Sequence, residues 1–105
     1  MSKIINDQNF DAIAAEGLPL IIDFSATWCG PCQRLAPIID ELSEEYAGRA
    51  NVCKCDIDES EDLAVRFGIR SVPTVVFIKN GEVVNRKVGA AKKSDFAEAF
   101  DEFLK

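Results

Sequence analysis

Histidine is absent from the 105 residues, and tryptophan and tyrosine occur once each. Without histidine the chain has no Cys–His nucleophile pair, no histidine-ligated metal site and no imidazole proton shuttle. Any chemistry must therefore use cysteine, carboxylate or lysine side chains, or Tyr46. Long apolar runs are also missing, so we expect no membrane-spanning helix and no secretory signal peptide. These absences favour a cytoplasmic chain, where thiols are kept reduced.

The composition is that of an ordinary globular protein, with 48% hydrophobic and 29% charged residues. A chain of this length predicts a single domain over residues 1–105. The net charge of −6 argues against long-range attraction to nucleic acid or to an anionic membrane. Four cysteines in a reduced compartment are more often catalytic, metal-binding or buried than paired in structural disulfides.

Strands and helices alternate along the chain in the order βαβαβαββα, and this alternation predicts an α/β fold. Its sheet should be mainly parallel with helices on both faces. The expected strands are 4–5, 20–24, 51–57, 74–78 and 82–88. Asn80-Gly81 between the last two favours a type I′ turn and an antiparallel hairpin.

Four helices are expected from apolar spacing and from their start and stop signals. The first contains Phe10 and Ile13 and should be capped by Asn6 or Asp7. The second follows residue 32, with apolar residues from Leu35 to Tyr46 and a kink at Pro37. The third should begin at Ser60-Glu61-Asp62, and Ser94 should open the last, which presents Phe96, Ala99, Phe100 and Phe103 on one face.

Cys29-Gly30-Pro31-Cys32 lies between a buried strand and the strongest predicted helix. A helix N-terminus has unpaired N–H groups and the positive end of a dipole, so it stabilises a thiolate at Cys29. Pro31 suits the first helical turn, where its missing N–H costs nothing. Because thiolate is the attacking species in disulfide exchange, this placement predicts redox chemistry at an exposed Cys29 sulfur.

Two other interpretations of the cysteines remain open. Cys29 and Cys32 together with Cys53 and Cys55 would supply the four sulfurs of a structural zinc site. Against this, Cys53 and Cys55 fall inside a predicted strand, where their side chains point the same way roughly 6.6 Å apart. We expect these two to be buried small hydrophobic residues. The remaining interpretation, two inert cysteines in the motif, conflicts with its place at a strand-to-helix junction.

Trp28-Cys29-Gly30-Pro31-Cys32 resembles the active-site signature of the thioredoxin family. The resemblance extends over essentially the whole chain through further segments in family order: Asp23-Phe24, Pro37, Asp56-Ile57-Asp58, Gly68 to Thr74, Asn80-Gly81 and Val88-Gly89-Ala90. It implies the thioredoxin fold, a five-stranded mixed sheet flanked by four helices.

Asp23 is unusual as a carboxylate within the apolar run Leu20–Phe24. Its spacing alone also fits a solvated strand face. The resemblance implies instead that it is buried beneath the cysteines, where a raised pKa would suit proton exchange with Cys32. Lys54 matches the family lysine near this carboxylate, although it could also be an ordinary solvated lysine.

Pro73 could simply begin a strand. The resemblance implies instead that the Val72–Pro73 bond is cis, that it faces the cysteines, and that the Val72 backbone binds an extended substrate. The implied docking surface around Cys29 is largely apolar and comprises Trp28, Gly30, Pro31, Val72, Pro73, Gly89 and Ala90. Gly30 and Gly89 could alternatively serve only turns.

Two positions depart from the family pattern. Ser25 stands where many members have a second tryptophan, and Gln33 replaces the common lysine after the motif, although Arg34 follows it. The resemblance implies a thiol–disulfide oxidoreductase that reduces protein disulfides as a monomer. It would need no bound cofactor or metal beyond the redox-active pair Cys29–Cys32, and thioredoxin reductase would recycle it. The alternatives to a reductase are a disulfide oxidase or isomerase of the same fold, and a binding subunit without turnover.

Overall fold

The structure is a computed structural model that describes residues 2–105, and its elements follow the predicted order βαβαβαββα. The strands are β1 (Lys3–Ile4), β2 (Leu20–Ser25), β3 (Asn51–Asp56), β4 (Thr74–Lys79) and β5 (Glu82–Val88). The helices are α1 (Phe10–Ala14), α2 (Gly30–Glu45), α3 (Glu61–Arg66) and α4 (Lys93–Phe103). No helix in this described part of the chain is both long and apolar enough to cross a membrane.

The five strands form one sheet in the order β1-β3-β2-β4-β5. β1 and β2 both run parallel to β3, whereas β4 is antiparallel to its neighbours β2 and β5. The sheet is therefore mixed, as the family resemblance implies, and the expectation of a mainly parallel sheet is wrong. The two-residue connection makes β4 and β5 antiparallel, and β4 also runs antiparallel to the central strand β2, so only two of the four strand pairs are parallel. Asn80 and Gly81 there have φ values of 54° and 80°, which confirms the type I′ turn.

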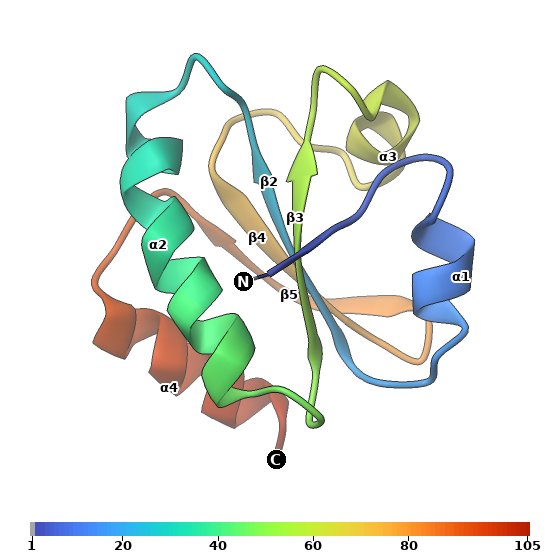
Figure 1. The fold of residues 1–105 in the computed structure, drawn as a ribbon, viewed down its shortest axis with the longest axis vertical. Coiled ribbons are helices and arrows are strands. Elements are labelled where there is room, and N and C mark those ends of the chain that lie inside the picture. Colours follow the sequence, from blue (N-terminus) through green and yellow to red (C-terminus); the bar gives the residue numbers. More distant parts are fainter. Residues whose placement is uncertain (1) are drawn as a thin grey trace.

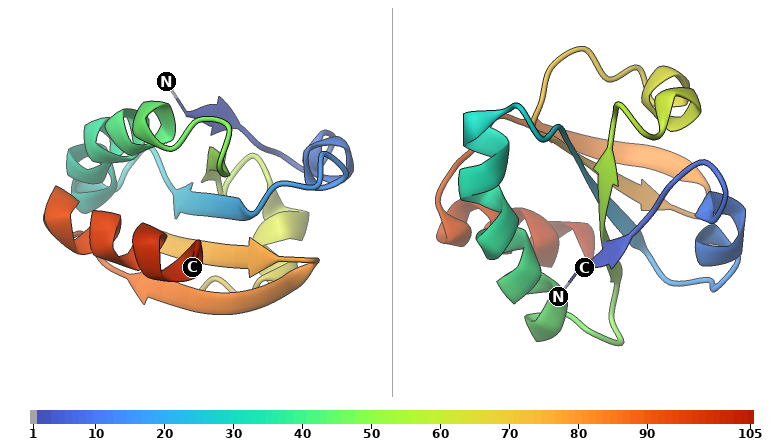
Figure 2. Two further views of the ribbon diagram at one scale, coloured as in Figure 1. Left: turned by 90° about the horizontal axis from the view of Figure 1, so that it is seen from below. Right: turned by 45° about the horizontal axis from the view of Figure 1, so that its top comes forward.

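Helices α2 and α4 lie on one face of the sheet, and α1 and α3 lie on the other (Figures 1 and 2). Each face has its own buried cluster. The α2/α4 side contains Ile21, Leu35, Val75, Phe77, Phe96 and Phe100, all fully buried. The α1/α3 side contains Phe10, Ile22, Phe24, Cys53, Cys55 and Phe67. The predicted apolar face of α4 is confirmed, because Phe96, Phe100 and Phe103 are its buried residues.

The expected start of α3 is confirmed, whereas the expected cap of α1 and the expected start of α4 differ from those observed. Asn6 does not cap α1 directly: its side chain accepts from the backbone N–H groups of Gln8 and Asn9 in the turn before the helix. Ser60 precedes α3 as expected but makes no side-chain cap bond. α4 begins at Lys93, one residue before Ser94.

Asp7, expected as a cap of α1, instead serves α3. Its carboxylate accepts from the backbone N–H of Leu63 at 3.0 Å and of Asp62 at 3.3 Å. These are otherwise unpaired donors in the first turn of α3, so a residue far away in sequence satisfies them.

Candidate redox site

Cys29 and Cys32 form a disulfide at the start of α2, with their Cα atoms 5.3 Å apart. Cys29 is the N-cap residue of this helix and has an extended backbone. Its sulfur accepts a hydrogen bond from the Cys32 N–H at 3.2 Å. The Cys29 sulfur therefore occupies the position that a capping oxygen takes in other helices, where the helix dipole and the free N–H groups stabilise negative charge. Pro31 lies in the first helical turn, as predicted.

The Cys29 side chain is less accessible than expected. Its exposed fraction is 6%, and that of Cys32 is 3%, so the prediction of an exposed Cys29 is wrong for the oxidised protein. The cause is packing around the disulfide, since Ala26, Ile57 and Val72 form a small cluster with both cysteines.

On the exposed side of the motif, Gly30 is followed by two polar residues, Gln33 and Arg34. A Cβ atom on Gly30 would lie 3.7 Å from Arg34 Nη1, so the guanidinium lies beside this glycine of the motif. Gln33 donates through its side chain to the Thr27 carbonyl at 2.7 Å. Residue 33 is the uncharged Gln33, where many family members have a lysine. Arg34 supplies a positive charge beside Gly30 instead, and a positive charge near a cysteine favours the thiolate.

The Val72–Pro73 peptide bond is cis, as the resemblance implies. The carbonyl oxygen of Val72 lies 3.7 Å from the Cys29 sulfur, so this loop does face the cysteine pair. Gly89 holds the loop from β5: it has a φ of 90° and donates its N–H to the Pro73 carbonyl at 2.8 Å. A positive φ suits glycine, so Gly89 has a conformational role as well as a place on this surface. Ala90 follows it and is exposed.

Trp28 is the large exposed side chain beside the motif, with an exposed fraction of 68%. Its indole N–H donates to a carboxylate oxygen of Asp58 at 2.9 Å. Asp58 is in turn held by its own N–H, which donates to the Asp56 side chain at 2.8 Å. The indole is therefore fixed in orientation although most of its surface is open to solvent.

Asp23 is buried, with an exposed fraction of 1%. Neither of its carboxylate oxygens has a hydrogen-bond partner among residues 2–105. Its side chain lies on the same sheet face as that of Ile21, the face covered by α2, and its register partner on β4 is Val75. Burial raises its pKa to about 7; the Lys54 ammonium opposes this rise and the Asp40 carboxylate adds to it. The alternative of a solvated strand face is wrong.

Lys54 is the register partner of Asp23 on β3, but its ammonium group bonds elsewhere. Its Nζ lies 3.1 Å from Asp40 Oδ1 on α2. The same Asp40 oxygen accepts from the backbone N–H and the hydroxyl of Ser2, at 3.1 and 2.7 Å. These partners lower the pKa of Asp40 against the opposing effect of its burial. Lys54 is thus neither the direct partner of Asp23 nor an unpaired solvated lysine.

The sequence analysis missed Asp40 as a member of this group. Asp40 lies on α2 at position i+1 after the buried Ile39, and nothing in its local pattern distinguishes it from an exposed helical carboxylate. Only the packing of α2 against β3 brings it to Lys54.

Cys53 and Cys55 are free and fully buried, as predicted. Burial raises the pKa of Cys53 to about 12 and that of Cys55 to about 11, so both stay neutral thiols near neutral pH. They belong to the α1/α3 cluster, apart from the cluster of Cys29 and Cys32. Among residues 2–105, no group of three or more His, Cys, Asp or Glu side chains is placed to hold a metal ion. The four sulfurs therefore do not converge as a zinc site requires.

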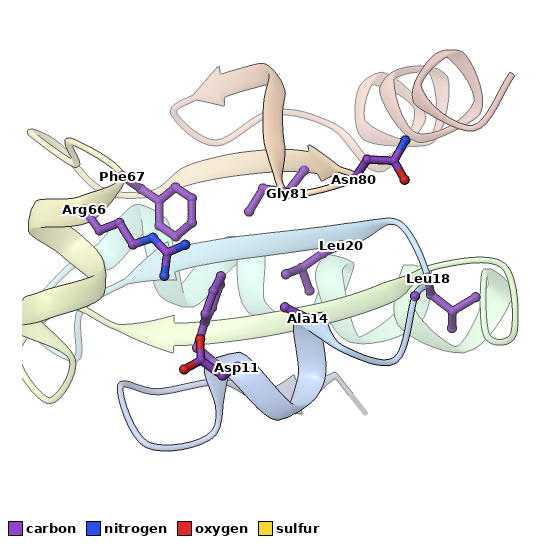
Figure 3. A pocket seen from close by; sticks show the side chains of 11 residues that line it. Asp11, Ala14, Leu18, Leu20, Arg66, Phe67, Asn80 and Gly81 are labelled. Carbon is purple, nitrogen blue, oxygen red and sulfur yellow. The ribbon is translucent and has the colours of Figure 1, made fainter.

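A cavity of about 220 Å³ lies away from the motif, between α1, the end of α3 and the β4–β5 turn (Figure 3). Phe10, Leu20, Phe67 and Ile78 supply its apolar walls, and the Arg66 guanidinium lies 4.7 Å from the centre of the Phe10 ring. None of its lining residues is a predicted site residue, so this cavity is separate from the redox pair.

The thioredoxin family model matches residues 1–102. This chain belongs to the thioredoxin family. It is 40% identical over 107 residues to a thioredoxin of Haemophilus influenzae, covering 99% of this chain and all of that protein. It is 45% identical over 105 residues to thioredoxin C-2 of Corynebacterium nephridii, covering 96% of each chain. It is also 43% identical over 103 residues to the chloroplastic M-type thioredoxin of Pisum sativum, covering 97% of this chain and 60% of that protein.

The family and the geometry together identify the reaction class of this thioredoxin-family chain. Its fold is the thioredoxin fold, and Cys29 and Cys32 form the redox-active disulfide of a WCGPC-type motif. The chain is a thiol–disulfide oxidoreductase.

Proposed function

We propose that this chain is a protein-disulfide reductase that carries electrons from a reductase to substrate disulfides. The observation that carries the proposal is the Cys29–Cys32 disulfide at the N-terminus of α2, with the Cys29 sulfur as the helix cap. A helix cap stabilises the thiolate of Cys29 once the disulfide is reduced, and the thiolate is the nucleophile of disulfide exchange.

In the proposed reaction, the Cys29 thiolate attacks one sulfur of a substrate disulfide. A mixed disulfide forms, and the other substrate sulfur leaves as a thiolate that takes up a proton. Cys32 then loses its proton and attacks the Cys29 sulfur, which releases the second substrate thiol. Two electrons pass to the substrate in all, and the oxidised product is the disulfide present in this structure.

Asp23 is the proposed proton acceptor for Cys32. Its pKa of about 7 supports this role, because a group that titrates near neutral pH can both take up and release the proton. Lys54 modulates Asp23 through its charge, which favours the ionised carboxylate. Pro73 and the carbonyl of Val72 would position an extended substrate beside the Cys29 sulfur.

The surrounding docking surface would consist of Trp28, Gly30, Pro31, Val72, Gly89 and Ala90. Small residues allow a foreign backbone to approach, and the exposed indole supplies apolar area. The proposed partners are thioredoxin reductase and disulfide-containing proteins, and we expect no nucleic-acid or membrane partner. We propose that the chain acts in the cytoplasm as a monomer over one domain, with no bound cofactor.

Two cysteine variants test the proposal in an insulin-reduction assay with dithiothreitol as the electron source. Cys29→Ser should lose turnover, because the attacking sulfur is gone. Reduced Cys32→Ser, mixed with insulin after dithiothreitol is removed, should accumulate mixed disulfides, because the resolving sulfur is gone. Cys55→Ala removes a buried thiol outside the motif and should retain turnover. Normal turnover by Cys29→Ser would contradict the proposal.

A redox titration separates a reductase from an oxidase or isomerase of the same fold. The Cys29/Cys32 couple should be largely oxidised at equilibrium with a glutathione buffer set to about −230 mV, because an efficient reductase has a potential below this value. A couple that stays reduced under the same conditions would indicate an oxidase.

A further inference from the structure

We infer that a groove between the segment 68–71 and strand β5 binds a carboxylate of the substrate, so that this chain favours disulfides flanked by an acidic residue. The inference deepens the proposed function and rests on it. It assigns two arginines, Arg70 and Arg86, to substrate selection rather than to the disulfide exchange itself.

The groove lies directly beside the proposed substrate-binding loop. Its volume is about 360 Å³, and it is lined by Arg70, Ser71, Thr74, Arg86 and Val88 together with Gly68 and Ile69. Ser71 precedes the Val72–Pro73 bond and Thr74, the first residue of β4, follows it; the Thr74 hydroxyl donates to the Ser71 carbonyl at 2.7 Å. A ligand in the groove would therefore be next to the carbonyl that faces the Cys29 sulfur.

The strand register places Arg86 on the correct face of the sheet. Val88 pairs with Thr74, and Arg86 pairs with Val76, whose side chain belongs to the α1/α3 cluster. Arg86 and Val88 therefore lie on the same side of β5, facing Arg70 across the groove. Lys87, between them, is directed to the opposite face, where its ammonium lies 5.3 Å from the centre of the Phe96 ring.

The charge of the groove is unbalanced. None of its lining residues is acidic. Within the described residues 2–105, neither the Arg70 nor the Arg86 guanidinium has an ion pair, whereas the lysines at positions 3, 54, 93 and 105 each have one. Two unpaired guanidinium groups in a chain of net charge −6 form a local positive site. Guanidinium groups bind carboxylates in a bidentate geometry, so the complementary ligand is an acidic side chain.

The docking surface is acidic on the Trp28 side, opposite the two arginines. This difference in charge favours one orientation of a bound substrate. The Trp28 indole donates to Asp58, and two further acidic residues are close to Asp58 in sequence: Asp56 at the end of β3 and Glu59 in the turn that follows. A substrate with an acidic residue would be attracted to the arginine side and repelled from the tryptophan side. Because residues of an extended chain advance about 3.3 Å each, two residues of a substrate paired beside Val72 reach about as far as Thr74 and Val88, which line the groove together with Arg70 and Arg86.

The test uses three synthetic peptides, each with one internal disulfide, that differ only two residues from one cysteine, where they carry Glu, Gln or Lys. For the unmodified protein, kcat/KM should be highest for the Glu peptide, by about threefold to tenfold over the Gln peptide at low ionic strength. Added salt should reduce this preference, because it screens the exposed charges. Arg70→Gln and Arg86→Gln should each reduce the ratio of kcat/KM for the Glu peptide to that for the Gln peptide.

Lys87→Gln is the matched control, because it removes the same charge from the neighbouring residue on the opposite face of β5. It should retain the preference for the Glu peptide. Equal rates for all three peptides, or an equal loss of preference in Lys87→Gln, would overturn the inference while leaving the proposed reductase intact. Failure of the unmodified protein to reduce any of the peptides, or insulin, would instead overturn the proposed function.

Discussion

Asp23 and Lys54 are direct register partners on the parallel strands β2 and β3, yet the Lys54 ammonium bonds to Asp40 on α2 and leaves the Asp23 carboxylate without a hydrogen bond among residues 2–105. Lys54 therefore acts on Asp23 only through its electric field. That effect opposes the larger effect of burial, so the pKa of Asp23 stands at about 7.

The first prediction concerns stability and pH. The folded-state pKa of Asp23, about 7, exceeds its ordinary value of 3.8, so the folded protein binds one more proton than the unfolded chain between these values. The destabilisation by ionised Asp23 is thus absent below pH 3.8, grows as the pH rises, and is complete above pH 7. The difference of about three pKa units corresponds to about 4 kcal/mol.

Asp23→Asn should remove this pH dependence. The free energy of unfolding of the variant, relative to the unmodified protein, should rise by about 4 kcal/mol from pH 4 to pH 8. Urea denaturation of the oxidised proteins, followed by Trp28 fluorescence, measures it. Asp11→Asn, at an exposed position on α1, serves as the control and should show no such rise. A pH-independent difference for Asp23→Asn would show that Asp23 is ionised in the folded protein at acidic pH.

The second prediction concerns the opposite effects of Lys54 and Asp40 on the pKa of Asp23. Lys54→Gln should raise the pKa of Asp23, because the Lys54 charge lowers it. Asp40→Asn should lower the pKa of Asp23, because the Asp40 charge raises it. The carboxyl carbon shift of Asp23 in NMR titrations measures both. Glu41→Gln removes a charge from the next residue of α2, which lies near Lys93, and should leave the titration unchanged. Shifts in the same direction for the first two variants would contradict this assignment.

The third prediction concerns the four thiols. Iodoacetamide should not label the folded, oxidised protein, because Cys53 and Cys55 are fully buried and burial raises the pKa of each thiol above 10. After reduction, labelling at pH 7 should occur first at Cys29, whose thiolate the start of α2 stabilises. Mass spectrometry of timed samples measures the order. In denaturant, the oxidised protein should take up two labels, and rapid labelling of Cys53 without denaturant would contradict its burial.

The fourth prediction concerns the cap that Asp7 provides for α3. Asp7→Ala should lower the free energy of unfolding by about 1 kcal/mol, because two N–H groups in the first turn of α3 lose their acceptor. Chemical denaturation at pH 7 measures the change. Asp7→Asn is the informative comparison, because its amide oxygen can still accept from one of these N–H groups. An unchanged free energy of unfolding in Asp7→Ala would contradict the assignment of the cap to Asp7.

The sequence by itself determined the features that depend on near neighbours. The spacing of apolar residues predicts the elements, Asn80-Gly81 predicts the hairpin, and Cys29 to Cys32 predicts the redox pair at a helix start. Each of these follows from backbone preferences or contacts within a few residues, so the local pattern contains the information.

The tertiary structure alone decided the contacts between distant segments. The pairing of Lys54 with Asp40, the capping of α3 by Asp7 and the groove between Arg70 and Arg86 join residues from different elements. An exposed carboxylate or guanidinium has the same local pattern whether or not a distant partner exists. The order of the strands and the packing of the helices on the sheet determine which of these charges meet, and neither is encoded in the spacing of neighbouring residues.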